Sequence, residues 1–233
     1  MKVENLLRGA IRGVETNRVT LDAAESGRLA APSGAARVLI FVEGRGEART
    51  GGRAFPWDGI AVLVSGPGAE CALRTDAPAR AISVECRIAS SESASAELPW
   101  FRSYADCPAY REAIKSPNTV SRTIVPEGVV PRFCMGSVEV RGPDAVAAHR
   151  HPKLEQLFYG LPGNDCIVRA DGADIPLGGD LLIHIPTGSE HAVRVASGKL
   201  LHYLWLDFFR REEDMDVIRQ THIPIAPGDG GTR

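Results

Sequence analysis

The stretch GPDAVAAHRHPKLEQLFYGLPG, residues 142–163, decides how this sequence is interpreted. It contains His149 and His151, and side chains two positions apart in a β-strand point to the same face, so both imidazoles can reach one point. Glu155 follows a turn that begins at Pro152 and could bring a carboxylate to the same place from the next strand. Neutral imidazole is the commonest metal ligand in proteins. The stretch therefore predicts part of a metal site on two neighbouring strands.

A further ligand is expected downstream. All six histidines lie at or beyond position 149, and the turn PTGSEH, residues 186–191, ends in a histidine after an apolar strand. A single histidine in a strand is more often a hydrogen-bonded structural residue than a ligand, so the prediction depends on the joint pattern. We predict that one divalent metal ion is bound by four side chains: His149, His151, Glu155 and His191.

The same residues resemble the two sequence motifs of the cupin superfamily. The first motif, a glycine, HxH, a glutamate and a downstream glycine, is matched by Gly142, His149, His151, Glu155 and Gly160 or Gly163. The second motif, a glycine, a strand and PxGxxH, is matched by Gly179, Pro186, Gly188 and His191. Three features depart from the motifs: Gly142 and Gly179 each stand one residue too far upstream, and Val195 replaces the usual asparagine. Loop length absorbs such shifts more easily than the loss of a ligand would.

The two halves of the chain look alike. Residues 37–88 and 132–207 consist of short apolar runs separated by Gly and Pro, which is typical of an all-β domain. With an offset of 120, Gly59 to Arg74 lies over Gly179 to Arg194, and Cys71 falls opposite His191. A slightly smaller offset pairs Phe41 with Phe158 and Val38 with Glu155. The expected fold is therefore all-β, and the resemblance implies two jelly-roll-like cupin barrels, a bicupin with a few short helices, in which only the second barrel keeps the metal.

The expected domain limits follow from composition. Four segments are expected: a degenerate, metal-free cupin-like β domain at 1–95, a linker with a short helix at 96–130, the metal-binding barrel at 131–210, and a C-terminal helix and tail at 211–233. The SSESASAELP segment reads as the linker, and Asp106 with Pro108 could begin the short helix after it. The first 15 residues suit a short amphipathic helix. The final GDGGTR is expected to be frayed.

Two further residues are weak candidates for substrate contacts. Tyr159 shares the face of Glu155 in the expected strand, whereas Gln156 does not, and a packed barrel aromatic is an equal alternative for Tyr159. His184 alternates with Pro186 and is a pocket-lining or core residue rather than a fifth ligand. Of His202 and Tyr203 only one can face the barrel interior, and the sequence does not decide which. His222, near the tail, is expected to be exposed.

Composition restricts the partners. The net charge of −2 and the scattered basic residues argue against nucleic acid, and no run approaches the roughly 20 apolar residues of a membrane span. Five cysteines without a CxxC pair suggest neither a disulfide framework nor a zinc-thiolate site, so most should be buried and reduced. We expect a cytoplasmic protein with a small-molecule substrate. Resemblance to cupins implies a homodimer.

Three imidazoles and one carboxylate would leave one or two open positions on the metal, as catalysis requires. The ligand set suits Fe(II), Mn(II), Ni(II) or Zn(II). The first hypothesis is a metal-dependent enzyme acting on a small polar organic molecule, narrowly favoured as a dioxygenase on family frequency alone, with an isomerase, lyase or decarboxylase as alternatives. A second hypothesis is a non-catalytic module that binds a small ligand. A third, a scaffold with a vestigial site, fits poorly with four retained ligands.

Overall fold

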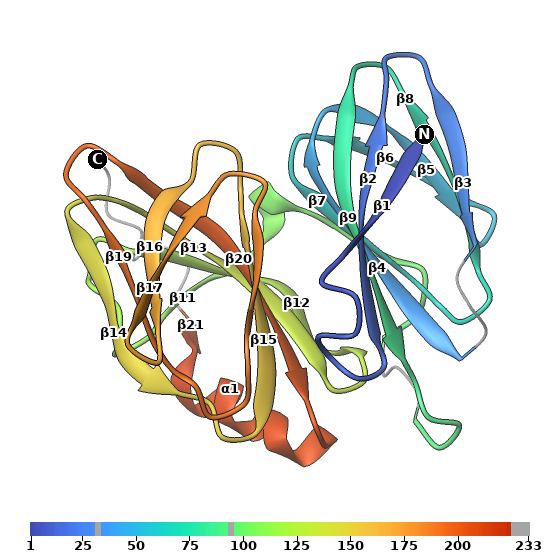
Figure 1. Ribbon diagram of the computed structural model, residues 1–233. Helices are drawn as coiled ribbons and strands as arrows, with labels where there is room; N and C mark the ends of the chain where they lie inside the picture. The colour runs from blue at the N-terminus through green and yellow to red at the C-terminus, as the bar shows by residue number, and fades with distance from the viewer. Residues whose placement is uncertain (31–33, 93–95, 225–233) are drawn as a thin grey trace. The chain divides into compact units, whose positions relative to one another are not determined.

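A computed structural model describes residues 1–30, 34–92 and 96–224 of the chain. Two compact units are present. The first contains residues 1–106 together with 127–131, and the second contains residues 107–126 together with everything from 132 onward. Strand β12 therefore belongs to the second unit at its start and to the first at its end. Figure 1 shows that both units are built almost entirely from strands.

The first unit contains two antiparallel sheets. Its elements are β1 (Lys2–Leu6), β2 (Val14–Leu21), β3 (Ser26–Ala30), β4 (Ala35–Glu43), β5 (Arg45–Thr50), β6 (Arg53–Asp58), β7 (Ala61–Ser65), β8 (Glu70–Thr75), β9 (Ala79–Arg87), β10 (Trp100–Ser103) and the 3₁₀ helix η1 (Tyr104–Asp106). One sheet has the order β1-β2-β9-β4-β7-β10 and the other the order β3-β8-β5-β6.

The second unit also contains two antiparallel sheets. Its elements are β11 (Ala109–Arg111), β12 (Val120–Val130), β13 (Phe133–Arg141), β14 (Asp144–Arg150), β15 (Leu154–Gly160), β16 (Asp165–Ala170), β17 (Ala173–Gly178), β18 (Leu182–Ile185), β19 (Glu190–Val195), β20 (Leu200–Phe209), the 3₁₀ helix η2 (Glu212–Met215), α1 (Asp216–Thr221) and β21 (Ile223–Pro224). The larger sheet has the order β18-β15-β20-β13-β12-β11-β21 and the smaller the order β14-β19-β16-β17.

The strand orders confirm the internal duplication. The order β1-β2-β9-β4-β7 of the first unit corresponds to β12-β13-β20-β15-β18 of the second, and β3-β8-β5-β6 corresponds to β14-β19-β16-β17. Strands β5, β6 and β8 begin 120 residues before β16, β17 and β19, which is the offset found in the sequence. The predicted fold class, two all-β jelly-roll-like barrels with few helices, is therefore confirmed.

Apolar side chains fill the interior of the first barrel. Leu29 and Cys71 face each other across β3 and β8, at the place where His149 and His191 face each other across β14 and β19. Nearby, the rings of Phe41 and Trp57 are stacked with centroids 4.0 Å apart. Of these four side chains only Cys71 carries a possible ligand atom, and burial raises the pKa of its thiol to about 11, so near neutral pH it is not the thiolate that binds metal. The first barrel therefore carries no counterpart of the second barrel's histidines.

The second barrel has an apolar core on one part of its interior and a pocket on another. In Figure 1 its smaller sheet lies on one side and β13, β15 and β20 on the other, with α1 at one end. Val168, Leu177 and Val193 of the smaller sheet pack in the same buried cluster as Phe158 and Tyr203 of the larger one. These inward-facing residues fix which face of each strand lines the interior.

Three of the expected elements need comment. The helix expected after Asp106 is not formed: residues 109–111 are strand β11, which pairs with β12 and so satisfies its backbone in a sheet. The N-terminal amphipathic helix is also wrong, because residues 2–6 form β1 along the edge of β2. The C-terminal helix is confirmed by η2 and α1. Parts of the expected linker (93–95) and the frayed tail (225–233) lie outside the described residues.

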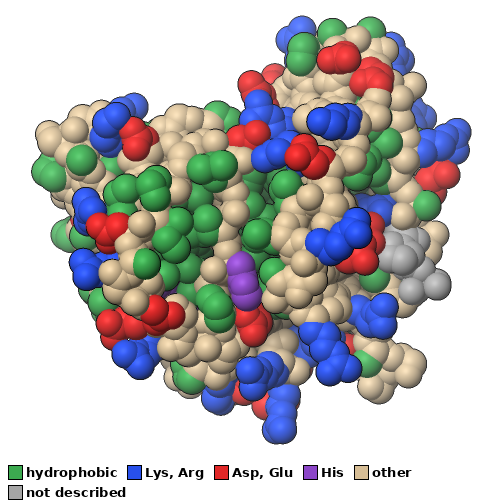
Figure 2. Space-filling model, viewed as in Figure 1, with side chains coloured by type: hydrophobic (Ala, Val, Ile, Leu, Met, Phe, Trp, Pro, Cys, Tyr) green, Lys and Arg blue, Asp and Glu red, His purple; other side chains and the backbone are tan. Residues whose placement is uncertain are grey.

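The surface and the cysteines agree with the composition. On the face shown in Figure 2, basic and acidic side chains are interspersed and form no continuous patch of one sign. All five cysteines are buried and free, as the sequence predicts for most of them. Among the described residues, no helix is long and apolar enough to cross a membrane.

Candidate metal centre

A β-bulge aims His149 and His151 into the second barrel. Strand β14 pairs Val146 with Val193 and His149 with His191, so β14 has one residue more than β19 between these two pairs. Val146 belongs to the core, and simple alternation would turn a residue three positions later away from it. The extra residue of the bulge reverses the alternation. This extra residue also accounts for the longer spacing between Gly142 and the HxH pair.

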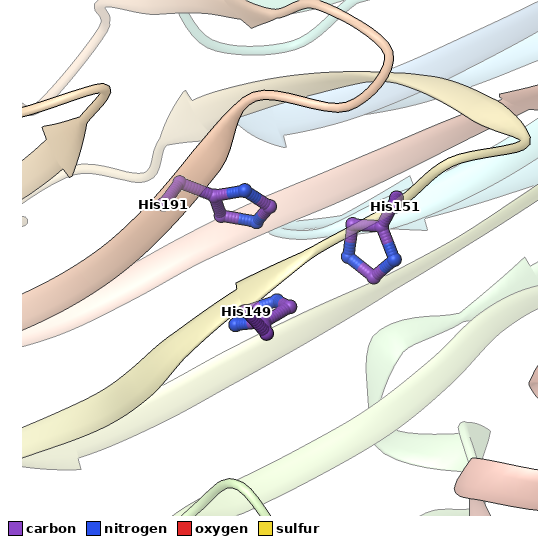
Figure 3. A group of neighbouring side chains, drawn as sticks. All are labelled: His149, His151 and His191. Carbon is purple, nitrogen blue, oxygen red and sulfur yellow. The ribbon is translucent and has the colours of Figure 1, made fainter.

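The three histidines form one cluster (Figure 3). His149 and His151 come from β14 and its end, His191 comes from the facing strand β19, and one nitrogen of each lies within 4.8 Å of the others. The ring centroids of His149 and His191 are 4.3 Å apart. His191 is 1% exposed, and its Nε2 has no hydrogen-bond partner. A buried polar atom without a partner costs free energy unless a ligand satisfies it, and an ion between the three rings would do so.

The electrostatics keep two of these imidazoles, those of His151 and His191, neutral. Burial, together with the neighbouring His149 and His191, lowers the pKa of His151 to about 3. Burial and the neighbouring His149 lower the pKa of His191 to about 4. Near neutral pH both rings therefore hold an unprotonated nitrogen, which is the form that binds metal.

Backbone carbonyls orient two of the rings. The Nδ1 of His149 lies 2.8 Å from the carbonyl oxygen of Ala147, and the Nδ1 of His191 lies 3.3 Å from that of Ser189. When Nδ1–H donates to a carbonyl, Nε2 is left as the free lone pair, which is the usual arrangement behind a metal-binding histidine. The cluster thus has the support expected of a metal centre.

Glu155 does not join the cluster. Its carboxylate lies on the other face of β15, where Oε2 is 2.7 Å from His184 Nε2 and Oε1 accepts a hydrogen bond from the Thr187 hydroxyl at 3.1 Å. The reason is alternation: Leu154 and Phe158 belong to the interior core, so the odd-numbered residues between them point away from it. The structure therefore does not support Glu155 as the fourth ligand.

Gln156 takes the inward position that the sequence assigned to Glu155. It lines the pocket that contains His149 and His151, and its Nε2 donates to Asp207 Oδ1 at 2.6 Å. This bond sets the orientation of the amide, because the other amide atom, Oε1, is the one left buried without a partner. Burial raises the pKa of Asp207 to about 7, although the bond from Gln156 opposes the shift. The inward position of β15 beside the pocket is therefore held by a neutral amide in place of a carboxylate.

Asp207 should act as a positioning residue for Gln156. Asp207→Leu removes the acceptor that fixes the amide, so we expect metal affinity to fall by about 10- to 100-fold, as for other residues that orient a metal ligand. Asp207→Asn keeps an acceptor oxygen and should retain most of the affinity. Titration of each variant with Zn(II) against a competing chelator measures the effect. Equal affinities in both variants would show that Asp207 does not orient a ligand.

The cluster opens into a pocket of about 200 Å³. Its walls come from β14, from the inward faces of β15 and β20, from the segment after β11 and from α1 with His222. Aromatic residues line much of it, with Phe158 lying 5.7 Å from the His191 ring and 4.8 Å from the Tyr203 ring. A concave, partly apolar site with a few polar groups is the usual form of a small-molecule site.

A buried polar group on the pocket wall was missed by sequence reasoning. The Lys115 ammonium forms an ion pair with Glu112 at 2.7 Å and donates to the Tyr110 hydroxyl at 3.0 Å and to Ser121 at 3.3 Å. Burial lowers the pKa of Lys115, against the attraction of Glu112. The sequence around these residues gives no metal or catalytic pattern that could have revealed them.

The remaining candidates are placed as follows. His222 is not exposed as expected: its side chain is 11% exposed and stacks on Tyr110 with centroids 4.1 Å apart, because α1 folds it onto the pocket. Tyr203 faces the interior, whereas His202 faces Glu139 at 3.8 Å.

The two weak candidates for substrate contacts share the face of Glu155. The Tyr159 hydroxyl donates to Asp180 at 2.6 Å, and His184 contacts Glu155. Both lie on the side of β15 and β18 away from the histidine cluster, so they are placed to support the strand rather than to touch a ligand in the pocket.

The fold and site define a class: proteins of two jelly-roll-like barrels with a histidine cluster in one. No family model matches the sequence, and no curated protein matches it. Among solved structures, a cupin 2 conserved barrel domain protein from Leptotrichia buccalis is similar, with a TM-score of 0.62 and 14% identity over 90% of this chain and 88% of that one. This chain therefore shares the fold of that protein.

Two other similar structures have very different descriptions. A salicylate 1,2-dioxygenase from Pseudaminobacter salicylatoxidans has a TM-score of 0.65 and 11% identity, covering 93% of this chain and 78% of that one. Procruciferin, an 11S globulin from Brassica napus, has a TM-score of 0.70 and 11% identity, covering 90% and 80%. At these identities the similarity shows the fold alone, so function has to be argued from the site.

Proposed function

We propose that this protein is a metal-dependent enzyme that acts on a small polar organic molecule in the second barrel. The observation that carries the proposal is the buried Nε2 of His191, which lacks a partner and lies beside two other imidazoles that line a pocket. Neutral nitrogens gathered in this way can share one cation as a common partner. A structural metal would be fully enclosed by side chains, whereas this cluster opens to a pocket.

The ligands in this proposal are His149, His151, His191 and the carbonyl oxygen Oε1 of Gln156. Gln156 replaces Glu155 because its oxygen is buried, unpartnered and on the inward face of β15. Three or four protein ligands leave at least one position for substrate on a five- or six-coordinate ion. Imidazole suits iron, nickel and zinc, and without a carboxylate the set is less suited to manganese.

The residues of the chain have separate tasks. Asp207 Oδ1 holds the Gln156 amide, and the carbonyl groups behind His149 and His191 hold the rings. Phe158 and Tyr203 present an apolar wall against which the body of a substrate can lie while water is excluded. When bound, a divalent ion would supply Lewis-acid polarisation of a substrate oxygen, and iron would add redox chemistry with O₂.

Among metal-dependent reactions we favour a dioxygenase with Fe(II). The support is the neutral imidazole-rich ligand set, which suits iron, and the similarity in fold to a protein described as a salicylate 1,2-dioxygenase. The globulin with the same fold shows that fold alone cannot make this choice.

The test is reconstitution followed by turnover. Protein loaded with one equivalent of Fe(II) should consume O₂ in the presence of small hydroxy acids, and Zn(II)-loaded protein should not. Conversion of the same acids without O₂ by the Zn(II) or Ni(II) form would move the assignment to isomerase or lyase. Stoichiometric metal without turnover in any form would leave a ligand-binding barrel and reject the enzyme.

A further inference from the structure

A carboxylate from a separate hairpin holds the turn that carries His191. Asp171 lies at the tip of the β16–β17 hairpin, where its Oδ2 accepts a hydrogen bond from the Ser189 hydroxyl at 2.8 Å and its Oδ1 accepts one from the Glu190 amide at 2.9 Å. The Asp171 amide in turn donates to the Glu190 carbonyl oxygen at 2.8 Å. Three hydrogen bonds therefore join this tip to the two residues that directly precede His191.

The hydrogen bonds continue to the imidazole itself. Ser189 is buried, and its carbonyl oxygen lies 3.3 Å from His191 Nδ1. When Nδ1–H donates to this carbonyl, Nε2 is the nitrogen left for a metal. The hydrogen bond from Ser189, followed by that from the Glu190 amide, lowers the pKa of Asp171, so near neutral pH its carboxylate can only accept. Asp171 thus fixes the residue whose backbone orients the His191 ring.

The formation of the hairpin turn does not account for these contacts. Asp171 and Gly172 have positive φ angles of 46° and 86°, as a two-residue hairpin loop requires, and Asp-Gly is a favoured pair there. A glycine at position 171 would meet the same backbone requirement without the cost of a side chain in the left-handed region. The carboxylate of Asp171 bonds instead to a different segment of the chain, so the side chain does more than form the turn.

The first barrel allows a comparison at the same positions. The offset of 120 residues relates three residues of the second barrel to counterparts in the first: Asp171 to Gly51, Ser189 to Ala69 and His191 to Cys71. The turn before the third position has the same backbone hydrogen bond in both barrels, from Ser189 to Pro186 and from Ala69 to Gly66. Glycine has no carboxylate and alanine has no hydroxyl. The carboxylate, the hydroxyl and the imidazole therefore occur together in one barrel and are replaced together in the other.

Building on the proposed function, we propose that Asp171 is a positioning residue of the metal centre, which acts through Ser189 to hold His191 in the orientation that binds the ion. Residues that orient a metal ligand typically change metal affinity by about 10- to 100-fold. The Asp171 side chain is exposed, so water competes for its hydrogen bonds and the lower end of this range is expected, about tenfold. Loss of the carboxylate also leaves the buried Ser189 hydroxyl without its partner.

Asp171→Gly gives position 171 the residue of the first barrel and is the main test. Glycine keeps the left-handed backbone and the amide that donates to Glu190, so the variant should fold. Its affinity for Zn(II), measured on the full chain by competition with a chelator, should be about tenfold lower than that of the parent. Ser189→Ala, the other change toward the first barrel, should also lower the affinity. The double variant should bind no more weakly than Asp171→Gly alone, because there the hydroxyl has already lost its partner.

Asp171→Asn separates positioning from a general loss of structure. Its amide oxygen can accept from the Glu190 amide and its NH₂ group can donate to the Ser189 hydroxyl oxygen, so both hydrogen bonds can be remade and the parent affinity should be recovered. The visible absorption spectrum of the Co(II)-loaded protein reports the geometry of the ligands. This spectrum should change in Asp171→Gly and should match the parent in Asp171→Asn.

Asp174→Ala is the matched control. Asp174 lies on β17 in the same hairpin and is also exposed, but its carboxylate pairs with Arg194 at 2.8 Å and not with the turn before His191. The control removes the same charge from the same hairpin and leaves the hydrogen bonds of Asp171 in place. It should therefore bind Zn(II) with the affinity of the parent and give the same Co(II) spectrum.

The outcomes separate this inference from the proposed function. Stoichiometric zinc bound with parent affinity by Asp171→Gly, or an equal loss of affinity in Asp174→Ala, would overturn the positioning role and leave the metal centre standing. A loss in Asp171→Gly that Asp171→Asn does not recover would also overturn it, because the effect would then come from charge and not from the hydrogen bonds. A parent chain that binds no zinc would overturn the proposed function and this inference with it.

Discussion

His191→Ala should abolish stoichiometric metal binding, reducing the metal content from about one equivalent to near zero after reconstitution and desalting. His191 is the most buried member of the cluster, and its Nε2 has no other partner to satisfy it. Ligand atoms gathered by the fold contribute jointly to affinity, so the loss of one imidazole from three removes most of the binding free energy. Elemental analysis of purified protein reconstituted with Fe(II) or Zn(II) is the measurement.

The matched pair for this experiment is Glu155→Ala and Gln156→Ala. Glu155 bonds to His184 and Thr187 on the far side of β15, so its loss should leave the metal content near one equivalent. Gln156 faces the pocket with a free oxygen, so its loss should weaken metal binding. Circular dichroism of both variants controls for unfolding.

The opposite result for these two variants would support Glu155, the residue that matches the sequence motif, as the fourth metal ligand. If Glu155→Ala lost the metal while Gln156→Ala kept it, β15 would have to present its other face to the cluster in solution. His191→Ala with undiminished metal would mean that the ion binds elsewhere, and the proposed enzyme would lose its centre.

The fold was predictable because the sequence contains it twice. The offset of 120 that places Cys71 over His191 also relates β8 to β19 in the structure, and both strands occupy the same place in their sheets. Short apolar runs separated by glycine indicate strands and turns locally. The repeat of this pattern in the second half of the chain indicates that both halves have the same topology. The segment around Asp106 was mispredicted because a proline near an acidic residue is compatible with either a helix start or a strand edge, and pairing with β12 decides.

The fourth ligand is where the sequence motif and the structure differ. The repeat pairs Phe41 with Phe158, and both rings lie in barrel interiors. Since alternate residues share a face, Phe158 inward requires Gln156 inward and Glu155 outward. The signal was therefore present in the sequence, but the fit of Glu155 to the cupin motif was given more weight than the strand period.

The rest of the pocket could not have been predicted. Glu112, Lys115 and His222 come from segments about a hundred residues apart, and only the pairing of β21 with β11 brings them together. Neither segment has a pattern that specifies the partner, because a single charged residue in a loop is usually solvated. Long-range strand pairing is a property of the whole barrel.

Lowering the pH from 7 to 5 should destabilise the metal-free second barrel by about 4 kcal/mol. Burial lowers the pKa of His151 to about 3 and those of His191 and His222 to about 4. Below pH 6.5 these histidines are therefore protonated in the unfolded chain but stay neutral in the folded chain. Stability therefore falls as the pH drops through 6.5 and continues to fall toward 4. Between pH 7 and pH 5 each histidine lowers the free energy of unfolding by about 2 kcal/mol, and the three together lower it by about 6 kcal/mol.

Asp207 opposes this trend. Its pKa is raised to about 7, whereas the ordinary value is near 3.8. Between these two pH values the folded chain binds a proton that the unfolded chain has released. Protonation of Asp207 therefore adds about 2 kcal/mol to the free energy of unfolding as the pH falls from 7 to 5. Urea unfolding followed by Trp205 fluorescence, in a background where Trp57 and Trp100 are phenylalanine, reports on the second barrel alone.

Two variants separate the opposing contributions. His222→Phe removes one of the three histidines and should reduce the acid loss from about 4 to about 2 kcal/mol. Asp207→Asn removes the opposing carboxyl and should increase the loss to about 6 kcal/mol. The two changes act in opposite directions because one group is buried as a neutral base and the other as a neutral acid. Equal stability at pH 7 and pH 5 in the parent would mean that His151, His191 and His222 are solvated, and a solvated His151 and His191 would not be the buried, neutral ligands that the metal centre requires.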